Sequence, residues 1–82
     1  MADIRIESEL WSTSMLPEGL LESWLAANGT LVEIGAPLAM LRIEDALHEI
    51  CAPAGGRLVI ETAVNGIVEP GSVIGQILPA QS

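Results

Sequence analysis

The chain has 82 residues, of which half are apolar, and its eleven acidic residues against three arginines give a net charge of −8. This length allows one small hydrophobic core, and the apolar content is typical of a folded domain and not of a disordered tail. The negative charge disfavours nucleic acid and anionic membranes as partners and favours a protein with a basic surface, although an acidic surface also serves solubility alone.

No apolar run reaches the roughly 18 residues that a membrane-spanning helix needs. The first residues, Met1-Ala2-Asp3, lack the basic and apolar regions of a secretion signal. The single cysteine, Cys51, cannot form an internal disulfide, which suits a reducing compartment. These observations predict a cytoplasmic protein.

Short strands are predicted along the chain, because turn signals interrupt its apolar stretches at short intervals. Residues 8–16 are expected to form a loop that contains Trp11. Segment 20–27 has helix propensity, but Pro-Glu-Gly before it and Asn-Gly after it favour a strand. The Asn-Gly pairs at 28–29 and 65–66 are strong turn signals, since both residue types tolerate positive φ. The predicted strands cover residues 3–7, 20–26, 31–33, 38–43, 47–51, 56–62, 67–69 and 73–78.

The chain repeats a set of landmarks with an offset of 36 residues. Pro17-x-Gly19 recurs as Pro53-x-Gly55, and Val32-Glu33-x-Gly35 recurs as Val68-Glu69-x-Gly71. The two Asn-Gly pairs are one residue further apart. Two copies are too few for a solenoid and instead predict two sheets related by pseudo-twofold symmetry. The expected core consists of Leu20, Trp24, Val32, Leu38, Ile50, Leu58, Val68 and Ile74.

Several of these motifs occur together in the lipoyl and biotinyl carrier domains. Pro17-Glu18-Gly19-Leu20-x-x-x-Trp24 resembles the Glu-Gly-x-Ile-x-x-Trp segment of lipoyl domains, and Glu49-Ile50-x-Ala52-Pro53 resembles the strand after their attachment hairpin. The resemblance covers residues 17–78 and implies a single domain over residues 1–82. It implies an all-β fold, a flattened barrel or sandwich of two four-stranded antiparallel sheets known as the barrel-sandwich hybrid.

The attachment residue of that family is missing from this chain. In those domains a lysine at the hairpin tip carries lipoate or biotin through an amide, and the resemblance places this position on Asp45, between Glu44 and Ala46. A carboxylate cannot form that amide, and the chain contains no lysine. We therefore expect no cofactor.

The candidate partner contacts are the Glu44 and Asp45 carboxylates, at the exposed tip where a carrier domain meets its partners, and Trp11 in the 8–16 loop. The two carboxylates could form charge-assisted hydrogen bonds with a basic groove. The alternatives are that Asp45 simply suits a turn and that Trp11 covers one end of the barrel.

No set of side chains predicts catalysis or a metal site. His48 is the only histidine, and alternation along a strand places it opposite Glu49 and Cys51. Cys51 therefore has no base beside it and is expected to be a small buried apolar residue. Ser12 and Ser14 lack the paired histidine and carboxylate of a hydrolase.

These observations favour a non-catalytic, stand-alone lipoyl- or biotinyl-like domain that serves as an interaction or accessory module. Its expected partner is a protein with a basic surface, such as a component of a 2-oxo acid dehydrogenase-like or carboxylase-like system. One alternative is a true lipoyl or biotin carrier domain whose lysine was lost or replaced at Asp45, naturally or by engineering. An enzyme is a third alternative, without a convergent set of catalytic groups to support it.

Overall fold

The computed structural model describes residues 2–12 and 14–79 and consists of eight strands and one short 3-10 helix. None of the described residues belongs to a helix long and apolar enough to cross a membrane. The elements are β1 (Ala2–Arg5), η1 (Ser8–Trp11), β2 (Gly19–Trp24), β3 (Leu31–Val32), β4 (Pro37–Ile43), β5 (Ala46–Cys51), β6 (Gly56–Ile60), β7 (Ile67–Val68) and β8 (Val73–Leu78).

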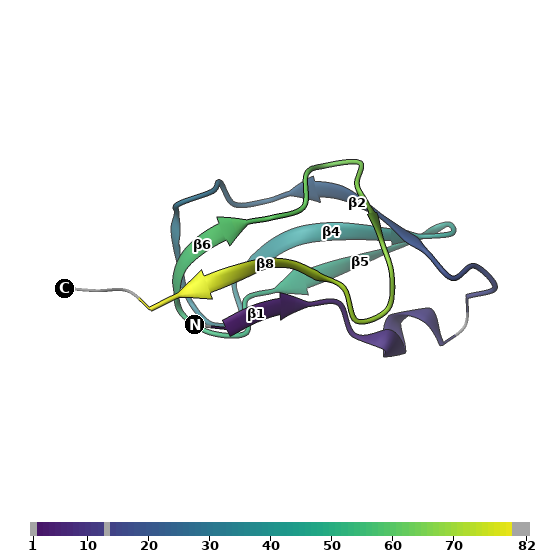
Figure 1. The fold of residues 1–82 in the computed structure, drawn as a ribbon, viewed down its shortest axis with the longest axis horizontal. Helices are drawn as coiled ribbons and strands as arrows, with labels where there is room; N and C mark the ends of the chain where they lie inside the picture. Colours follow the sequence, from purple (N-terminus) through teal and green to yellow (C-terminus); the bar gives the residue numbers. More distant parts are fainter. Residues whose placement is uncertain (1, 13, 80–82) are drawn as a thin grey trace.

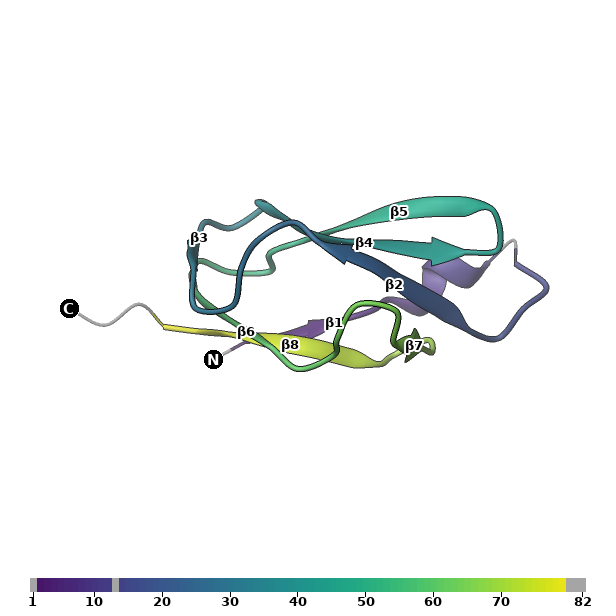
Figure 2. The same cartoon turned by 90° about the horizontal axis from the view of Figure 1, so that it is seen from above.

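The strands form two four-stranded antiparallel sheets, with the order β1-β8-β6-β3 in one and β5-β4-β2-β7 in the other. Figure 2 shows β4 and β5 above β1, β6 and β8, so that the two sheets enclose the core between them. The predicted all-β fold of two four-stranded sheets is confirmed. Segment 20–27 contains most of β2 and no helix, as expected from its flanking turns.

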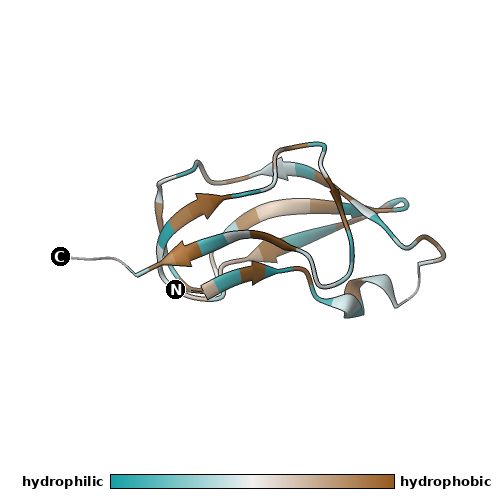
Figure 3. Cartoon of the chain, viewed as in Figure 1, coloured by the Kyte–Doolittle hydropathy of each residue, from teal (hydrophilic) through white to brown (hydrophobic). Residues whose placement is uncertain are grey.

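Apolar and charged residues alternate along β1, whereas β8 is apolar over most of its length (Figure 3). The buried apolar side chains of both sheets fill the space between them. Five of the eight predicted core residues are buried: Leu38, Ile50, Leu58, Val68 and Ile74. Trp24 and Val32 are partly buried and pack against this core. The prediction for Leu20 was wrong, because Leu21 is the β2 residue that points inward, fully buried, and Leu20 faces outward.

The two halves of the chain repeat each other with an offset of 36 residues at the level of the backbone. Gly35 and Gly71 take nearly the same left-handed conformation, with φ of 85° and 87°. At the same offset, Gly29 (φ 88°) corresponds to Asn65 (φ 73°). The sequence pattern matches Asn28-Gly29 with Asn65-Gly66, but the backbone shows that these two pairs are not equivalent. The offset is therefore 36 residues at this turn as well, and the extra residue between the two Asn-Gly pairs is explained.

The halves differ in the connection that leads into β2. Ile6 and Ala52 make equivalent backbone hydrogen bonds, to Ser72 and Ala36 respectively, but they lie 46 residues apart. The first half therefore contains ten additional residues, which include the whole segment predicted as the 8–16 loop. This segment begins with the 3-10 helix η1, which the sequence patterns did not predict.

Trp11, at the end of η1, is 8% exposed and belongs to the core. Its ring lies against Gly19, where an added Cβ would stand 3.2 Å from Trp11 Cζ2 and 3.1 Å from Ile43 Cγ1. Trp11 therefore covers the end of the barrel near the β4–β5 hairpin. Of the two interpretations of Trp11, the one in which it covers an end of the barrel is confirmed, and its choice as a candidate partner contact was wrong, because the added segment folds back and buries the ring.

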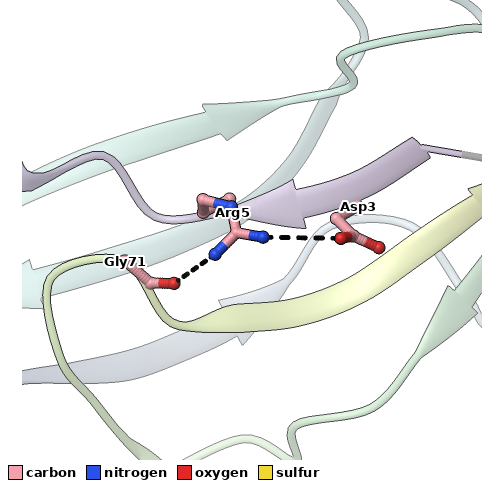
Figure 4. A network of polar contacts seen from close by, with 3 residues as sticks. All are labelled: Asp3, Arg5 and Gly71. Atoms are coloured by element: carbon pink, nitrogen blue, oxygen red, sulfur yellow. Dashed lines mark hydrogen bonds and ion pairs between the residues drawn. The ribbon is translucent and has the colours of Figure 1, made fainter.

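Arg5 fastens the end of β1 to the turn before β8 (Figure 4). Its Nη1 atom donates a hydrogen bond of 2.9 Å to the Gly71 carbonyl oxygen, and Nη2 lies 3.5 Å from Asp3 Oδ2. Both side chains are largely exposed, so this ion pair contributes little to stability. The backbone hydrogen bonds between Ile6 and the turn at Gly71 and Ser72 fix the same junction.

Candidate functional site

The β4–β5 hairpin ends in the two-residue loop Glu44-Asp45. The last paired residues are Ile43 and Ala46, and a loop of two residues needs a positive φ at its first position. Glu44 supplies it with φ of 55°, an uncommon value for a residue with a side chain. Figure 1 shows this hairpin tip at the opposite end of the molecule from the start of β1 and the end of β8. Asp45 thus lies at the exposed tip, where the sequence placed it.

Glu44 holds the neighbouring segment against the hairpin. Its Oε2 atom accepts hydrogen bonds from the Met15 backbone N–H at 2.9 Å and from the Ser14 hydroxyl at 3.2 Å. The Ser14 Oγ atom also accepts a hydrogen bond of 3.1 Å from the Leu16 backbone N–H. The Glu44 carboxylate was predicted as a partner contact, and the structure shows it in contacts within the chain, where it fixes residues 14–16 beside the tip.

We expect Glu44→Ala to loosen residues 14–16 without unfolding the domain. Loss of two exposed hydrogen bonds to a carboxylate costs about 1 kcal/mol, which corresponds to roughly fivefold faster amide exchange at Met15. Hydrogen exchange followed by NMR measures this rate directly. Asp45→Ala is the matched control from the same loop, and an equal acceleration in both variants would contradict the role of Glu44.

Asp45 presents its carboxylate to solvent, and the structure gives it no hydrogen-bond partner among the described residues. The nearby Arg42 is bound to Glu22 instead, with a 2.9 Å hydrogen bond from Nε to Oε1. This bond raises the pKa of Arg42, with a smaller contribution from Asp45, and it lowers the pKa of Glu22. The positive charge of Arg42 is therefore neutralised by Glu22 on β2 and not by Asp45, and the hairpin tip remains acidic.

The remaining reactive side chains of the hairpin lie on opposite faces of β5. His48 lines a recess with Ile43 and Ala46 near η1, whereas Cys51 is exposed on the other face. The Cys51 thiol lies 3.6 Å from Glu49 Oε1, and partial desolvation together with this carboxylate raises the pKa of Cys51. The prediction that Cys51 is buried was wrong, because Cys51 lies on the outer face of β5 together with Glu49, while Ile50 between them is buried. Its protonated thiol is a poor nucleophile.

The described residues contain no group of three or more His, Cys, Asp or Glu side chains that could hold a metal ion. The three arginines are each engaged within the fold, Arg5 with Gly71, Arg42 with Glu22 and Arg57 with the Gly29 carbonyl oxygen. The tip therefore offers carboxylates and apolar side chains and no amine. The side chains of this surface cannot form an amide with an acid cofactor, since none of them is a primary amine.

Sequence reasoning missed Ser14 and Met15 as parts of this end of the molecule. Both lie in the added segment before β2, which has no counterpart in the second half of the chain. One indication of this segment was present in the sequence: the part of the chain before Pro17 is longer than the part that precedes Pro53 within the second repeat.

Two antiparallel four-stranded sheets with this pseudo-twofold repeat and a protruding β4–β5 hairpin define the barrel-sandwich fold of lipoyl-type domains. No protein-family model matches the chain, and no curated protein matches it significantly. Solved structures do match. One is the solution structure of the lipoyl domain of the 2-oxoglutarate dehydrogenase complex from Azotobacter vinelandii, with a TM-score of 0.73 and 18% sequence identity over 95% of this chain and 99% of that domain. The chain thus has the fold of a lipoyl domain along nearly its whole length.

Proposed function

We propose that this chain is a lipoyl-like domain that carries no prosthetic group and acts by binding another protein. The observation that carries the proposal is the carboxylate of Asp45 at the tip of the β4–β5 hairpin, in a chain without any lysine. A carrier domain needs a primary amine at this place to form the amide with lipoate or biotin. The lipoyl-domain fold supports the rest of the proposal, since its β4–β5 hairpin presents Asp45 at one end of the molecule.

The partner that fits this surface is a protein with a basic patch, because Asp45 is solvent-exposed and the whole chain carries a net charge of −8. The similar domain from Azotobacter vinelandii is part of a 2-oxoglutarate dehydrogenase complex. By analogy we place this domain as an accessory module of a dehydrogenase-like or carboxylase-like system in the cytoplasm, and nucleic acid and membranes do not suit its charge.

The absence of a cofactor predicts the mass of the native protein. Purified from its own host, the chain is expected to have the mass of its bare sequence, and an increment equal to lipoate or biotin would contradict the proposal.

Asp45→Lys should fold normally, since an exposed turn substitution changes stability by about 0.5 kcal/mol or less. Lipoate and biotin ligases are then expected to label this variant at residue 45.

The matched control for the ligase experiment is Glu49→Lys, which introduces the same change of charge on an exposed position of the same hairpin. Mass spectrometry of the labelled peptides distinguishes the two. Equal labelling of both variants, or none in Asp45→Lys, would remove the basis for equating the tip with the attachment position.

The lack of lysine also gives a direct test for the partner. A carbodiimide joins carboxylates to amines without a spacer, so that the side chains of this protein can supply only the carboxylate of each cross-link. Treatment of cells from the native host is expected to link Glu44 or Asp45 to lysines of one partner. Cross-links spread evenly over the eleven acidic residues would contradict a contact at the tip.

A further inference from the structure

Four side chains form a continuous row on the outer face of the sheet that carries the hairpin. The register pairs Leu47 of β5 with Arg42 of β4, Arg42 with Leu20 of β2, and Leu20 with Ile67 of β7. Residues paired across antiparallel strands point to the same face. Their neighbours in sequence, Leu21 and Val68 among them, are buried, so the row faces solvent. It crosses three strand spacings, a length of about 14 Å.

This row is apolar apart from Arg42, and it is unusually exposed for its composition. Leu47 is 49% exposed and Ile67 is 60% exposed, and Leu20 between them is half-buried. Leu16 and Pro17 line a shallow recess together with Leu20 and Ile67, which extends the apolar surface toward the hairpin tip. We call this surface, made of Leu16, Leu20, Leu47 and Ile67, the apolar row.

The segment that completes the apolar row is fixed before any partner binds. Glu44 accepts a hydrogen bond from the Met15 backbone N–H, and the Ser14 hydroxyl oxygen accepts one from the Leu16 backbone N–H. The Met15 side chain itself is 92% exposed. The protein thus holds this backbone in place although the Met15 side chain gains no burial from it. A preordered apolar surface of this kind lowers the entropy cost of binding a partner.

Carboxylates surround the apolar row. Glu18 and Glu44 line the recess beside Leu20, and Asp45 and Glu49 lie next to Leu47 along the hairpin. Arg42 lies between Leu20 and Leu47 and brings a single positive charge to this face, where its guanidinium is bound to Glu22. Two copies of this face would bring like charges together, which disfavours self-association. The occupant that matches both features has an apolar stripe flanked by lysine or arginine.

We propose that the apolar row is the docking surface for a basic amphipathic helix of a partner protein. This inference rests on the proposed function and deepens it, since it names the surface and the kind of partner element. A row of about 14 Å matches two to three turns of a helix, whose apolar side chains recur on one face. Leucine-type side chains of the helix would cover Leu20, Leu47 and Ile67, and its basic side chains would pair with Glu18, Asp45 and Glu49.

The test uses a synthetic helical peptide of about 18 residues made of leucine and lysine, with a leucine and glutamate peptide of the same pattern as control. Titration of the isotope-labelled protein is followed by NMR. The lysine peptide is expected to shift the amide signals of Leu20, Leu47 and Ile67 and to bind more weakly as salt is raised. Binding of the glutamate peptide with equal affinity would overturn the proposal.

The chain offers a closely matched pair of variants for this test. Ile67 and Leu31 each begin a two-residue strand, lie 36 residues apart, and are 60% and 59% exposed. Ile67→Ser is expected to weaken binding of the lysine peptide at least about fivefold, because it removes one of the three apolar side chains that the helix would cover. Leu31→Ser, at the opposite end of the molecule, is expected to leave the affinity unchanged within about twofold.

If Ile67→Ser and Leu31→Ser changed the affinity for the lysine peptide equally, the peptide would be bound by charge alone. This result would overturn the proposal. Leu47→Ser, on a different strand, repeats the test should Ile67→Ser fail to fold. Binding to phosphatidylglycerol vesicles that exceeds binding to the lysine peptide would also overturn it, in favour of a lipid surface. The mass and ligase experiments do not depend on this face, so failure here leaves the proposed absence of a cofactor standing, and the reverse holds as well.

Discussion

Gly56→Ala is expected to destabilise the domain by about 3 kcal/mol or more. Gly56 begins β6 with φ of 152°, a conformation that residues with a side chain rarely adopt. An added Cβ would overlap the backbone carbonyl oxygen of Leu78 and would lie 2.8 Å from Ile77 Cγ2, both on the neighbouring strand β8. Backbone strain and overpacking each cost about 1–3 kcal/mol, and here they add because no flexible side chain can move aside.

The preceding residue is the control for this prediction. A Cβ at Gly55 would have the Val32 carbonyl oxygen as its nearest neighbour at 3.5 Å, which is an ordinary contact. Gly55→Ala is therefore expected to change the free energy of unfolding by about 0.5 kcal/mol or less. Urea denaturation of the two variants gives both values. A similar midpoint for Gly56→Ala and the unmodified protein would show that β6 and β8 do not approach each other as closely as described.

Trp11→Ala is expected to cost about 3–5 kcal/mol, the usual loss for a large aromatic residue removed from a core. The ring is 8% exposed and packs beside Gly19 and Ile43, so its removal leaves a cavity beneath the hairpin tip. An exposed partner anchor would instead tolerate the change with little effect on stability. Thermal or urea denaturation separates the two possibilities.

Replacement by phenylalanine tests the polar part of the same side chain. The Trp11 Nε1 atom is buried and has no hydrogen-bond partner among the described residues, whereas Trp24 Nε1 donates a bond of 2.8 Å to the Thr62 carbonyl oxygen. Trp11→Phe relieves an unsatisfied donor, which offsets part of the lost packing, and should change stability by about 1 kcal/mol or less. Trp24→Phe loses a hydrogen bond and is expected to cost more, and the opposite order would contradict these assignments.

The amino-acid sequence by itself determined most of the turns between the strands and the absence of a lysine side chain. Turns at Gly35 and Gly71 were predictable because left-handed backbone is a local demand that glycine meets at no steric cost. The all-β fold followed from such turns between short apolar stretches. The lack of an amine was decided by composition alone, since no arrangement of a chain without lysine can supply one at the hairpin tip.

Only the tertiary structure decided which faces of these strands are covered. The register shift between Leu21 and Ser23 in β2 breaks the simple alternation, so that Trp24 shares the inner face with Leu21 and not with Leu20. Cys51 is exposed because the pairing of β5 with β4 places Ile50 opposite the buried Ala39 and leaves Cys51 on the outer face.

The contacts at the hairpin end likewise depend on residues far apart in the chain. Glu44 bonds to Ser14 and Met15 across about thirty residues, and Trp11 is buried against Gly19 and Ile43 because η1 folds back over the barrel end. The apolar row takes its side chains from β2, β5, β7 and the segment before β2. Periodicity within one strand reports only which of its residues share a face, and the pairing of strands decides which faces lie side by side.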